Sequence, residues 1–190
     1  MKNLQKTILI AMLTAVATVL FFFSFPIIPS ISMLKMDFSD IPAIVGGVLI
    51  NPIAGVIIQL LKNFIYLIIK GMGSNMGFGN LMNLLVGTAY VLPYAIIVRK
   101  MRGSLKGFVI AALVATAAML IVGFFANYII SPPYFRAFSN KGIGQEEALA
   151  FAIGSTMFNA IKAGIISVFM AFIMKYAIPP LKKIVDKASK

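Results

Sequence analysis

Cysteine, histidine and tryptophan are absent from this sequence, and only five of its 190 residues are acidic. Without cysteine the chain can form no disulfide and has no thiol nucleophile. Without histidine it also lacks the usual zinc ligands and the side chain that most often serves in acid–base catalysis. Enzymes that depend on zinc, cysteine or histidine are therefore excluded, and we expect neither a metal site nor a catalytic site.

A nucleotide-binding loop is missing as well. Glycines at positions 71, 73, 77 and 79 form a glycine-rich segment, but no Gly-x-x-x-x-Gly-Lys-Ser/Thr motif occurs in the chain. That motif holds nucleotide phosphates with its backbone N–H groups and its lysine. We therefore expect that the chain does not hydrolyse ATP by itself and is not an enzyme.

Long apolar runs are what the sequence does contain. Hydrophobic residues make up 61% of the chain, charged residues 12%, and the mean hydropathy is +0.99. Apolar regions at residues 7–25, 41–69, 81–98, 108–130 and 148–178 approach or exceed the roughly 20 residues that cross a bilayer. The first region is too long for the core of a cleavable signal peptide, so we expect it to be a membrane helix. The composition predicts an integral membrane protein.

The second apolar region, residues 41–69, is too long for a single helix. It would measure roughly 44 Å, more than the hydrocarbon core of a bilayer. Asn51-Pro52 interrupts it, and a proline ends a helix at the preceding residue. We therefore predict an all-α, polytopic membrane protein with one membrane-embedded domain, residues 1–190. Its six transmembrane helices are expected at about residues 7–25, 41–50, 53–70, 80–98, 107–130 and 148–178.

The basic residues form three clusters that predict the topology. Eleven of the 17 lie at the N-terminus, in segment 99–106 or from residue 175 onward. With six helices, these clusters all lie on one side of the membrane, and the other side carries no net charge. The positive-inside rule then places both termini in the cytoplasm. The net charge of +12 thus indicates topology and contact with anionic lipid, and we expect no nucleic-acid partner.

Three polar side chains occur within or at the end of the last two apolar regions. Asn159 and Lys162 lie three residues apart and share one helix face, and Asn127 lies near the outer end of the preceding region. A lysine at this depth costs roughly 2.5–3.5 kcal/mol and usually faces a cavity. Such a group suits a flat, partly apolar ligand with polar edges. Alternatively, Lys162 reaches a surface or pairs with a neighbouring helix, and Lys62 lines the same pocket or faces a partner.

The outer loops, residues 26–40, 71–79 and 131–147, are either lids or simple connectors. Leu34, Met36 and Phe38 favour packing of the first loop onto the bundle. Asp37 and Asp40 are expected in this loop, with Asp40 capping the following helix. No carboxylate is expected among the membrane helices, so a small cation is not the expected ligand.

Taken together, the chain resembles the substrate-binding S components of energy-coupling factor (ECF) vitamin transporters, in particular the riboflavin-specific group. Ala11-x-x-x-Ala15 resembles the small-residue contact of that family. Segment 34–42 with segment 51–55 resembles the first outer loop and the broken second and third helices of the riboflavin group. Asn127, Asn159 and Lys162 match positions that hydrogen-bond riboflavin there.

The resemblance implies high-affinity capture of riboflavin from outside, in a pocket in the outer half of the bundle. Riboflavin would be the transported ligand and not a cofactor. Hydrogen bonds to the polar edge of its ring or to its ribityl chain would come from Asn127, Asn159 and Lys162. The residues expected to cover the site are Met36, Asp37 and Phe38.

The same resemblance implies partner subunits and a location in the bacterial cell membrane. Ala11 and Ala15 would contact a transmembrane coupling subunit, because small residues four apart let helices approach closely. Two ATP-binding cassette ATPases would supply the energy for delivery of riboflavin into the cell.

Other functions remain open at this point. An S component for another B vitamin, such as pantothenate, is the nearest alternative. A thiamine carrier is disfavoured by the lack of tryptophan, and an autonomous secondary transporter by the expected lack of a carboxylate within a membrane helix. In a structural membrane protein, the same three polar residues would only bond between helices, and Lys162→Met would leave the protein equally or more stable.

Overall fold

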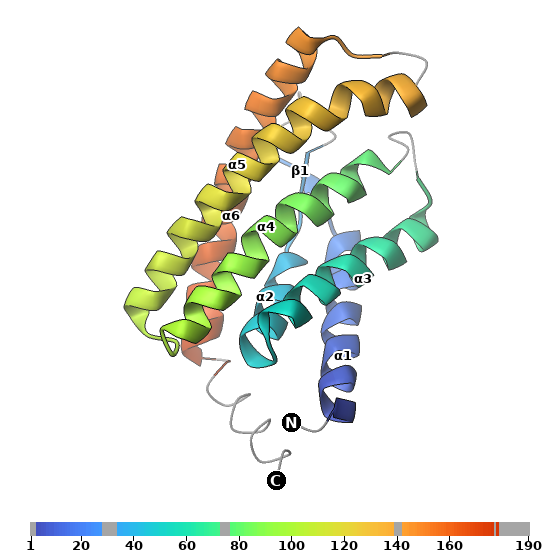
Figure 1. Ribbon diagram of the computed structural model, residues 1–190. Coiled ribbons are helices and arrows are strands. Elements are labelled where there is room, and N and C mark those ends of the chain that lie inside the picture. Colours follow the sequence, from blue (N-terminus) through green and yellow to red (C-terminus); the bar gives the residue numbers. More distant parts are fainter. Residues whose placement is uncertain (1–2, 28–33, 73–76, 139–141, 177, 179–190) are drawn as a thin grey trace.

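A computed structural model describes residues 3–27, 34–72, 77–138, 142–176 and 178 (Figure 1). Parts of the three outer loops (28–33, 73–76 and 139–141) and the lysines at 182, 183, 187 and 190 lie outside these residues. The elements are α1 (Asn3–Phe22), β1 (Phe25–Pro26), β2 (Lys35–Met36), α2 (Asp40–Leu49), α3 (Pro52–Lys70), α4 (Phe78–Lys100), α5 (Leu105–Phe138) and α6 (Gln145–Tyr176). The prediction of an all-α protein with six helices is confirmed.

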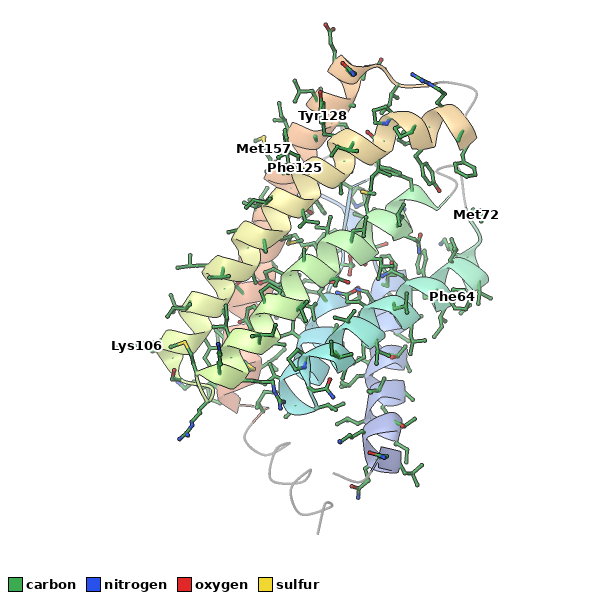
Figure 2. The ribbon with its side chains drawn as sticks, in the orientation of Figure 1. Phe64, Met72, Lys106, Phe125, Tyr128 and Met157 are labelled. Carbon is green, nitrogen blue, oxygen red and sulfur yellow. The ribbon has the colours of Figure 1, made fainter. Side chains whose placement is uncertain are left out.

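Five of the helices are long and apolar enough to cross a membrane, and α2 is the short one. Their outward faces carry large apolar side chains. Phe64, Phe125 and Met157 are each more than half exposed and point away from the bundle (Figure 2). Such a surface suits lipid, because lipid tails are as apolar as these side chains.

The break between α2 and α3 lies at Asn51-Pro52, as the sequence predicts. Asn51 has an extended backbone, and its side-chain oxygen accepts the N–H of Ala54 at 2.8 Å. Pro52 begins α3, where its missing N–H has no helical partner to lose. The end of α2 is held from α4, because Arg99 Nη1 donates to the carbonyl of Val48 at 2.6 Å.

The short helix α2 is enclosed by its neighbours. Seven of its ten residues are buried, and α2 packs against α1, α3 and α4. Glycines allow this close approach: a Cβ atom at Gly47 would lie 2.7 Å from the Cβ atom of Ala95 on α4. A Cβ atom at Gly55 would lie 2.8 Å from the carbonyl oxygen of Ala43 on α2 and from Val91 on α4. Enclosure explains how a helix of about 15 Å is accommodated within the bundle.

Two segments differ from the helix limits expected from the sequence. The first helix ends at Phe22, and residues 25–26 form a two-residue antiparallel pairing with residues 35–36. The fifth helix continues to Phe138 through Pro132 and Pro133, which the sequence placed in a loop. The rings of Tyr134 and Phe135 lie 5.1 and 5.0 Å from that of Phe78, and this packing stabilises the extension despite the prolines.

The start of α1, the turn between α4 and α5, and the end of α6 lie at one end of the molecule (Figure 1). That end therefore gathers Lys6, the basic segment 99–106 and Lys175, as the charge pattern predicts. We call it the basic end. The location of this end in the cytoplasm stays a prediction.

Candidate functional site

A cavity of about 240 Å³ opens in the half of the bundle away from the basic end. Its wall is formed by β2 and by parts of α1, α3, α4, α5 and α6. The uncharged polar side chains that line it include Ser24, Asn80, Asn83, Asn127, Ser155 and Asn159, and the apolar ones include Phe21, Phe78, Met82, Met119, Phe151 and Phe158. Lys35, Lys70 and Lys162 add three ammonium groups. The cavity thus joins aromatic walls to a limited set of polar groups, as small-molecule sites do.

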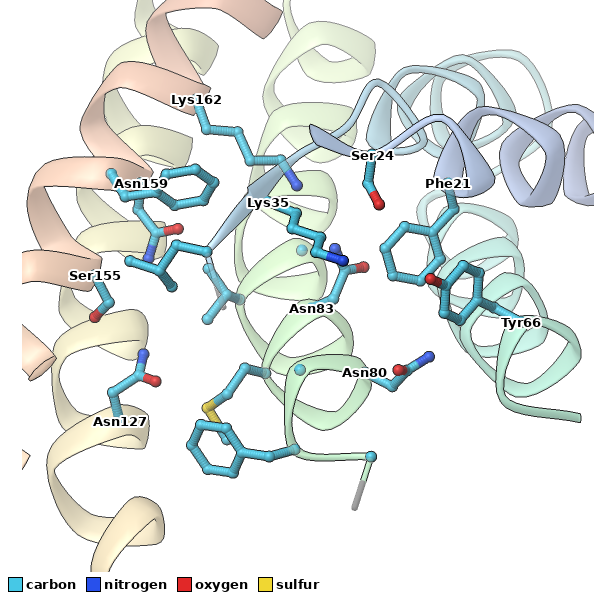
Figure 3. Close-up of a pocket in the computed structure, with 18 of the residues that line it drawn as sticks. Phe21, Ser24, Lys35, Tyr66, Asn80, Asn83, Asn127, Ser155, Asn159 and Lys162 are labelled. Atoms are coloured by element: carbon cyan, nitrogen blue, oxygen red, sulfur yellow. The ribbon is translucent and has the colours of Figure 1, made fainter. Parts of the chain in front are cut away.

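One side of the cavity brings together the three polar residues that the sequence singled out. Asn127 of α5 and Asn159 and Lys162 of α6 all line it (Figure 3). The expectation that Asn159 and Lys162 share one helix face is confirmed. All three side chains are at least nine-tenths buried. A convergent group of this kind can hold the polar edge of a ligand.

Asn127 offers an acceptor that no other described residue uses. Its Nδ2 atom donates to the carbonyl of Gly123 at 2.7 Å, while its Oδ1 atom has no hydrogen-bond partner within the part of the chain that the structure describes. A buried acceptor without a partner costs free energy, which a ligand N–H group would recover. Gly123 also makes room for Asn159, since a Cβ atom there would lie 2.6 Å from Asn159 Nδ2.

Lys162 lines the cavity and also forms ion pairs with two carboxylates. Its Nζ atom lies 2.9 Å from Asp37 Oδ2 and 2.9 Å from Asp40 Oδ2, and both carboxylates are fully buried. The two possibilities for Lys162, facing a cavity and pairing with a neighbouring element, are therefore both realised. The expectation of no carboxylate among the membrane helices is wrong. The segment after β2 folds inward because Lys162 and Lys62 offer buried positive charges.

Asp40 does not cap α2 as the sequence led us to expect. Ser39 occupies the N-cap position, and Asp40 is the first helical residue. Asp40 Oδ1 accepts hydrogen bonds from Lys62 Nζ and from Gln59 Nε2, both at 2.7 Å. Asp37 Oδ1 accepts the backbone N–H of Ser39 at 2.9 Å and also the Ser39 hydroxyl. Ionic partners from distant helices thus outweigh the local capping bond.

Lys62 is fully buried and does not line the cavity, so it neither forms the pocket wall nor faces a partner. Its Nζ atom donates to Asp40 and to the Ser39 hydroxyl, and it lies 5.5 Å from the centre of the Phe21 ring. Both alternatives drawn from the sequence are therefore wrong for Lys62. It belongs instead to a buried cluster of two aspartates and two lysines, which we call the charge cluster: Asp37, Asp40, Lys62 and Lys162.

Met36, Asp37 and Phe38 lie beside the cavity but not in its wall. Met36 is buried in the core, and the Phe38 ring packs against Phe169 at 5.1 Å. Lys35 lines the cavity instead, because neighbouring side chains of an extended strand point to opposite sides. Asp37 reaches the site through Lys162 and through Asn83, whose Nδ2 atom donates to Asp37 Oδ2 at 3.3 Å.

Several wall residues were missed in the sequence. Asn80 and Asn83 are three residues apart in α4 and line the cavity together. Their spacing is the same as that of Asn159 and Lys162, so the same argument about one helix face would have found them. Ser24 gave no such signal, because residues 20, 21, 27 and 28 are apolar. Tyr66 has Lys62, Asn63 and Lys70 at helical spacing, so the same argument would have found it too.

Ala11 and Ala15 lie on the exposed face of α1, whereas Thr14, Ala17 and Thr18 of the same helix are buried. The two alanines are therefore not part of the internal packing. Neither of them lines the cavity. Their small side chains leave that face of α1 accessible for close approach of another helix.

Comparisons with known proteins agree with this architecture. The family model of the substrate-specific component of ECF transporters matches residues 5–174. The Bacillus subtilis protein named riboflavin transporter FmnP is 33% identical over 173 residues, covering 90% of each chain. The Streptococcus thermophilus riboflavin transporter RibU is 30% identical, and the alignment covers 98% of this chain and 87% of that protein. The Staphylococcus aureus riboflavin transporter RibU is 31% identical, and the alignment covers 93% of this chain and 90% of that protein.

The fold has a solved counterpart. The structure of the S component of a bacterial ECF transporter superposes with a TM-score of 0.72 and 28% sequence identity, over 95% of this chain and 99% of that one. Family, fold and apolar helices agree on a multi-pass protein of the bacterial plasma membrane. The chain belongs to the family of ECF transporter substrate-specific components, which are substrate-binding parts of transporters and not enzymes.

Proposed function

We propose that this chain is the riboflavin-binding S component of an ECF-type importer and that riboflavin binds in the cavity described above. The observation that carries the proposal is the convergence of Asn127, Asn159 and Lys162 in a cavity with aromatic walls. The curated relatives named above, which are 30–33% identical to this chain, are riboflavin transporters.

The chemistry of the cavity matches the shape and polarity of riboflavin. Its flat ring system has one edge of carbonyl and N–H groups, an opposite apolar edge, and a hydroxyl-rich ribityl chain. Lys162 can only donate hydrogen bonds, which suits a ring carbonyl or a ribityl hydroxyl, and Asn127 Oδ1 can accept an N–H group. Phe78 and Phe158 would contact the apolar part of the ring.

The other half of the cavity has hydroxyl and amide groups for the remaining part of the ligand. Ser24 and Tyr66 lie opposite Asn127 and Asn159, with Asn80 and Asn83 between them (Figure 3). These groups can both donate and accept, as a chain of hydroxyls requires. Met36, Asp37 and Phe38 are proposed to act indirectly, by holding the segment that carries Leu34 and Lys35 against the ligand.

Delivery into the cell requires other subunits, because the sequence has no ATPase motif. We propose that a transmembrane coupling subunit packs against α1 at Ala11 and Ala15 and that two ATP-binding cassette ATPases drive the cycle. The exposure of both alanines supports this assignment. No cofactor is required for this function, and riboflavin is the cargo.

Bulky substitutions on α1 are expected to separate binding from transport. In the Ala11→Trp/Ala15→Trp variant, the indole rings would prevent close approach of a partner helix, so uptake of radiolabelled riboflavin by cells should fall at least about tenfold. Riboflavin binding by the purified chain should remain within about twofold, because α1 presents these residues away from the cavity. Ala117→Trp, on the exposed face of α5, is the matched control and should retain uptake.

The proposed function is tested by riboflavin titration of the detergent-purified chain. We expect flavin absorbance in the purified protein or saturable quenching of riboflavin fluorescence at one site per chain. A colourless protein that leaves riboflavin fluorescence unchanged would refute riboflavin as the ligand. Thermal-shift measurements with pantothenate and other B vitamins would then test the nearest alternative, since a ligand stabilises the state that binds it.

A further inference from the structure

Asp40 lies outside the cavity wall, yet it contacts Lys162, which lines the cavity. The two oxygens of its carboxylate have different partners. Oδ2 lies 2.9 Å from Lys162 Nζ, whereas Oδ1 accepts hydrogen bonds from Lys62 and Gln59 at 2.7 Å each. Asp40 therefore connects α6, which forms one side of the cavity, to α3 on the far side of the charge cluster.

The orientation of Asp40 is held from several directions. It is fully buried at the first residue of α2, where the helix dipole favours a negative charge. Gly87 of α4 closes the site from another side. A Cβ atom there would lie 2.8 Å from Gln59 Nε2 and 3.1 Å from Asp40 Oδ1. This carboxylate consequently has little freedom to turn away from Lys162.

Lys62 balances the charge that Asp40 brings into the protein interior. Asp37 and Asp40 with Lys162 alone would leave a buried net charge of −1, and Lys62 brings the charge cluster to zero. A buried charge without a partner is strongly destabilising. Because Lys62 has no place in the cavity wall, its contacts point to support of Asp40 and not to contact with a ligand.

Contacts with Asp37 and Asp40 fix the position of the Lys162 ammonium group. An ammonium group has three N–H donors, and Lys162 donates one of them to Asp37 Oδ2 at 2.9 Å. Asp40 Oδ2 lies at the same distance from Nζ as an ion-pair partner without a hydrogen bond. Asp37 lies in the segment after β2, whereas Asp40 lies in a buried helix. Without Asp40, the position of the Lys162 ammonium group would depend on Asp37 alone, which lies in the segment after β2. With both carboxylates, two buried charges hold the ammonium group in place at the cavity wall, and its remaining N–H groups are available to a ligand.

We propose that Asp40 and Lys62 form a positioning pair that holds the ammonium group of Lys162 in the orientation in which it donates to the ligand. This inference rests on the proposed function, in which Lys162 bonds to riboflavin. It assigns Asp40 and Lys62 a role in affinity although neither touches the cavity. The competing role is purely structural: the pair would only join α2 to α3.

A charge-neutral double variant separates the two roles. Asp40→Asn alone leaves Lys62 without its carboxylate, so we expect a lower thermal unfolding temperature and about tenfold weaker riboflavin binding in the titration. Asp40→Asn/Lys62→Met removes both charges, and the unfolding temperature should recover because no buried charge is left unpaired. The affinity should remain about tenfold below that of the unchanged protein, because Lys162 still lacks its second carboxylate.

The control is Glu146→Gln, which removes an exposed carboxylate on α6 and should change neither property. Recovery of affinity together with stability in the double variant would overturn the positioning role. Failure of the double variant to fold would assign the pair to the scaffold and would overturn it too. If the unchanged protein binds no riboflavin, the proposed function itself fails. The two failures are thus distinguished by whether the unchanged protein binds.

Discussion

Lys162→Met is expected to weaken riboflavin binding by about 100-fold. The variant loses a charge-assisted hydrogen bond, which contributes roughly 1.5–3 kcal/mol, and leaves a ligand acceptor without a donor. It also leaves Asp37 and Asp40 with Lys62 as their only ammonium partner in the charge cluster. Fluorescence titration measures the affinity, and thermal unfolding reports the cost of the unbalanced charge.

A second variant separates these two effects. Lys162→Met/Asp37→Asn removes one charge of each sign, so the charge cluster stays neutral and the unfolding temperature should rise again. Binding should stay weak, because the donor is still missing. Lys106→Met, an exposed lysine at the basic end, should behave like the unchanged protein (Figure 2). If the double variant bound riboflavin as well as the unchanged protein, Lys162 would only be a link between helices.

Gly55→Ala is expected to give the largest loss of stability among small substitutions. The added methyl group would lie 2.8 Å from the carbonyl oxygen of Ala43 and from a side-chain carbon of Val91. Backbone cannot move aside as a flexible side chain can, so the three helices α2, α3 and α4 must separate, at a cost of about 1–3 kcal/mol. Thermal unfolding of the purified protein in detergent measures the effect.

The matched control for this substitution is Gly164→Ala. Gly164 is exposed in the interior of α6, and a Cβ atom there would meet no other atom within 4 Å. Because alanine is the better helix former, this variant should be as stable as the unchanged protein or slightly more so. Equal unfolding temperatures for the two variants would mean that close packing at Gly55 does not stabilise the bundle.

The fold was largely predictable because its signals are local. The helix break at Asn51-Pro52 was expected from the proline alone, and Pro52 begins α3. The side chain of Asn51 adds a cap that was not predicted, although it too is a local interaction. The end of the fifth helix was not predictable from Pro132 and Pro133. Local chemistry disfavours helix there, and the aromatic packing onto Phe78 that compensates comes from another part of the chain.

The site was predictable only in part. Asn159 and Lys162 could be predicted because they are two polar residues three positions apart within an apolar run. The structure brings both into one cavity with Asn127. Asp40 gave a misleading local signal, since an aspartate just before a helix usually caps it. Asp37 was expected in the outer loop and not among buried charges. Their buried positions follow from Lys62 and Lys162, and the spacing of residues along the chain contains no information about such pairs.

The sequence by itself determined the class of protein, the number of helices and the separation of basic from neutral ends, because composition, run length and charge act independently of tertiary contacts. Only the tertiary structure decided which charges meet. Asp37 and Lys162 are 125 residues apart, yet their atoms lie 2.9 Å from each other. The physical reason is that buried charges require partners wherever the fold can supply them, and only the packed bundle determines which ones come within reach.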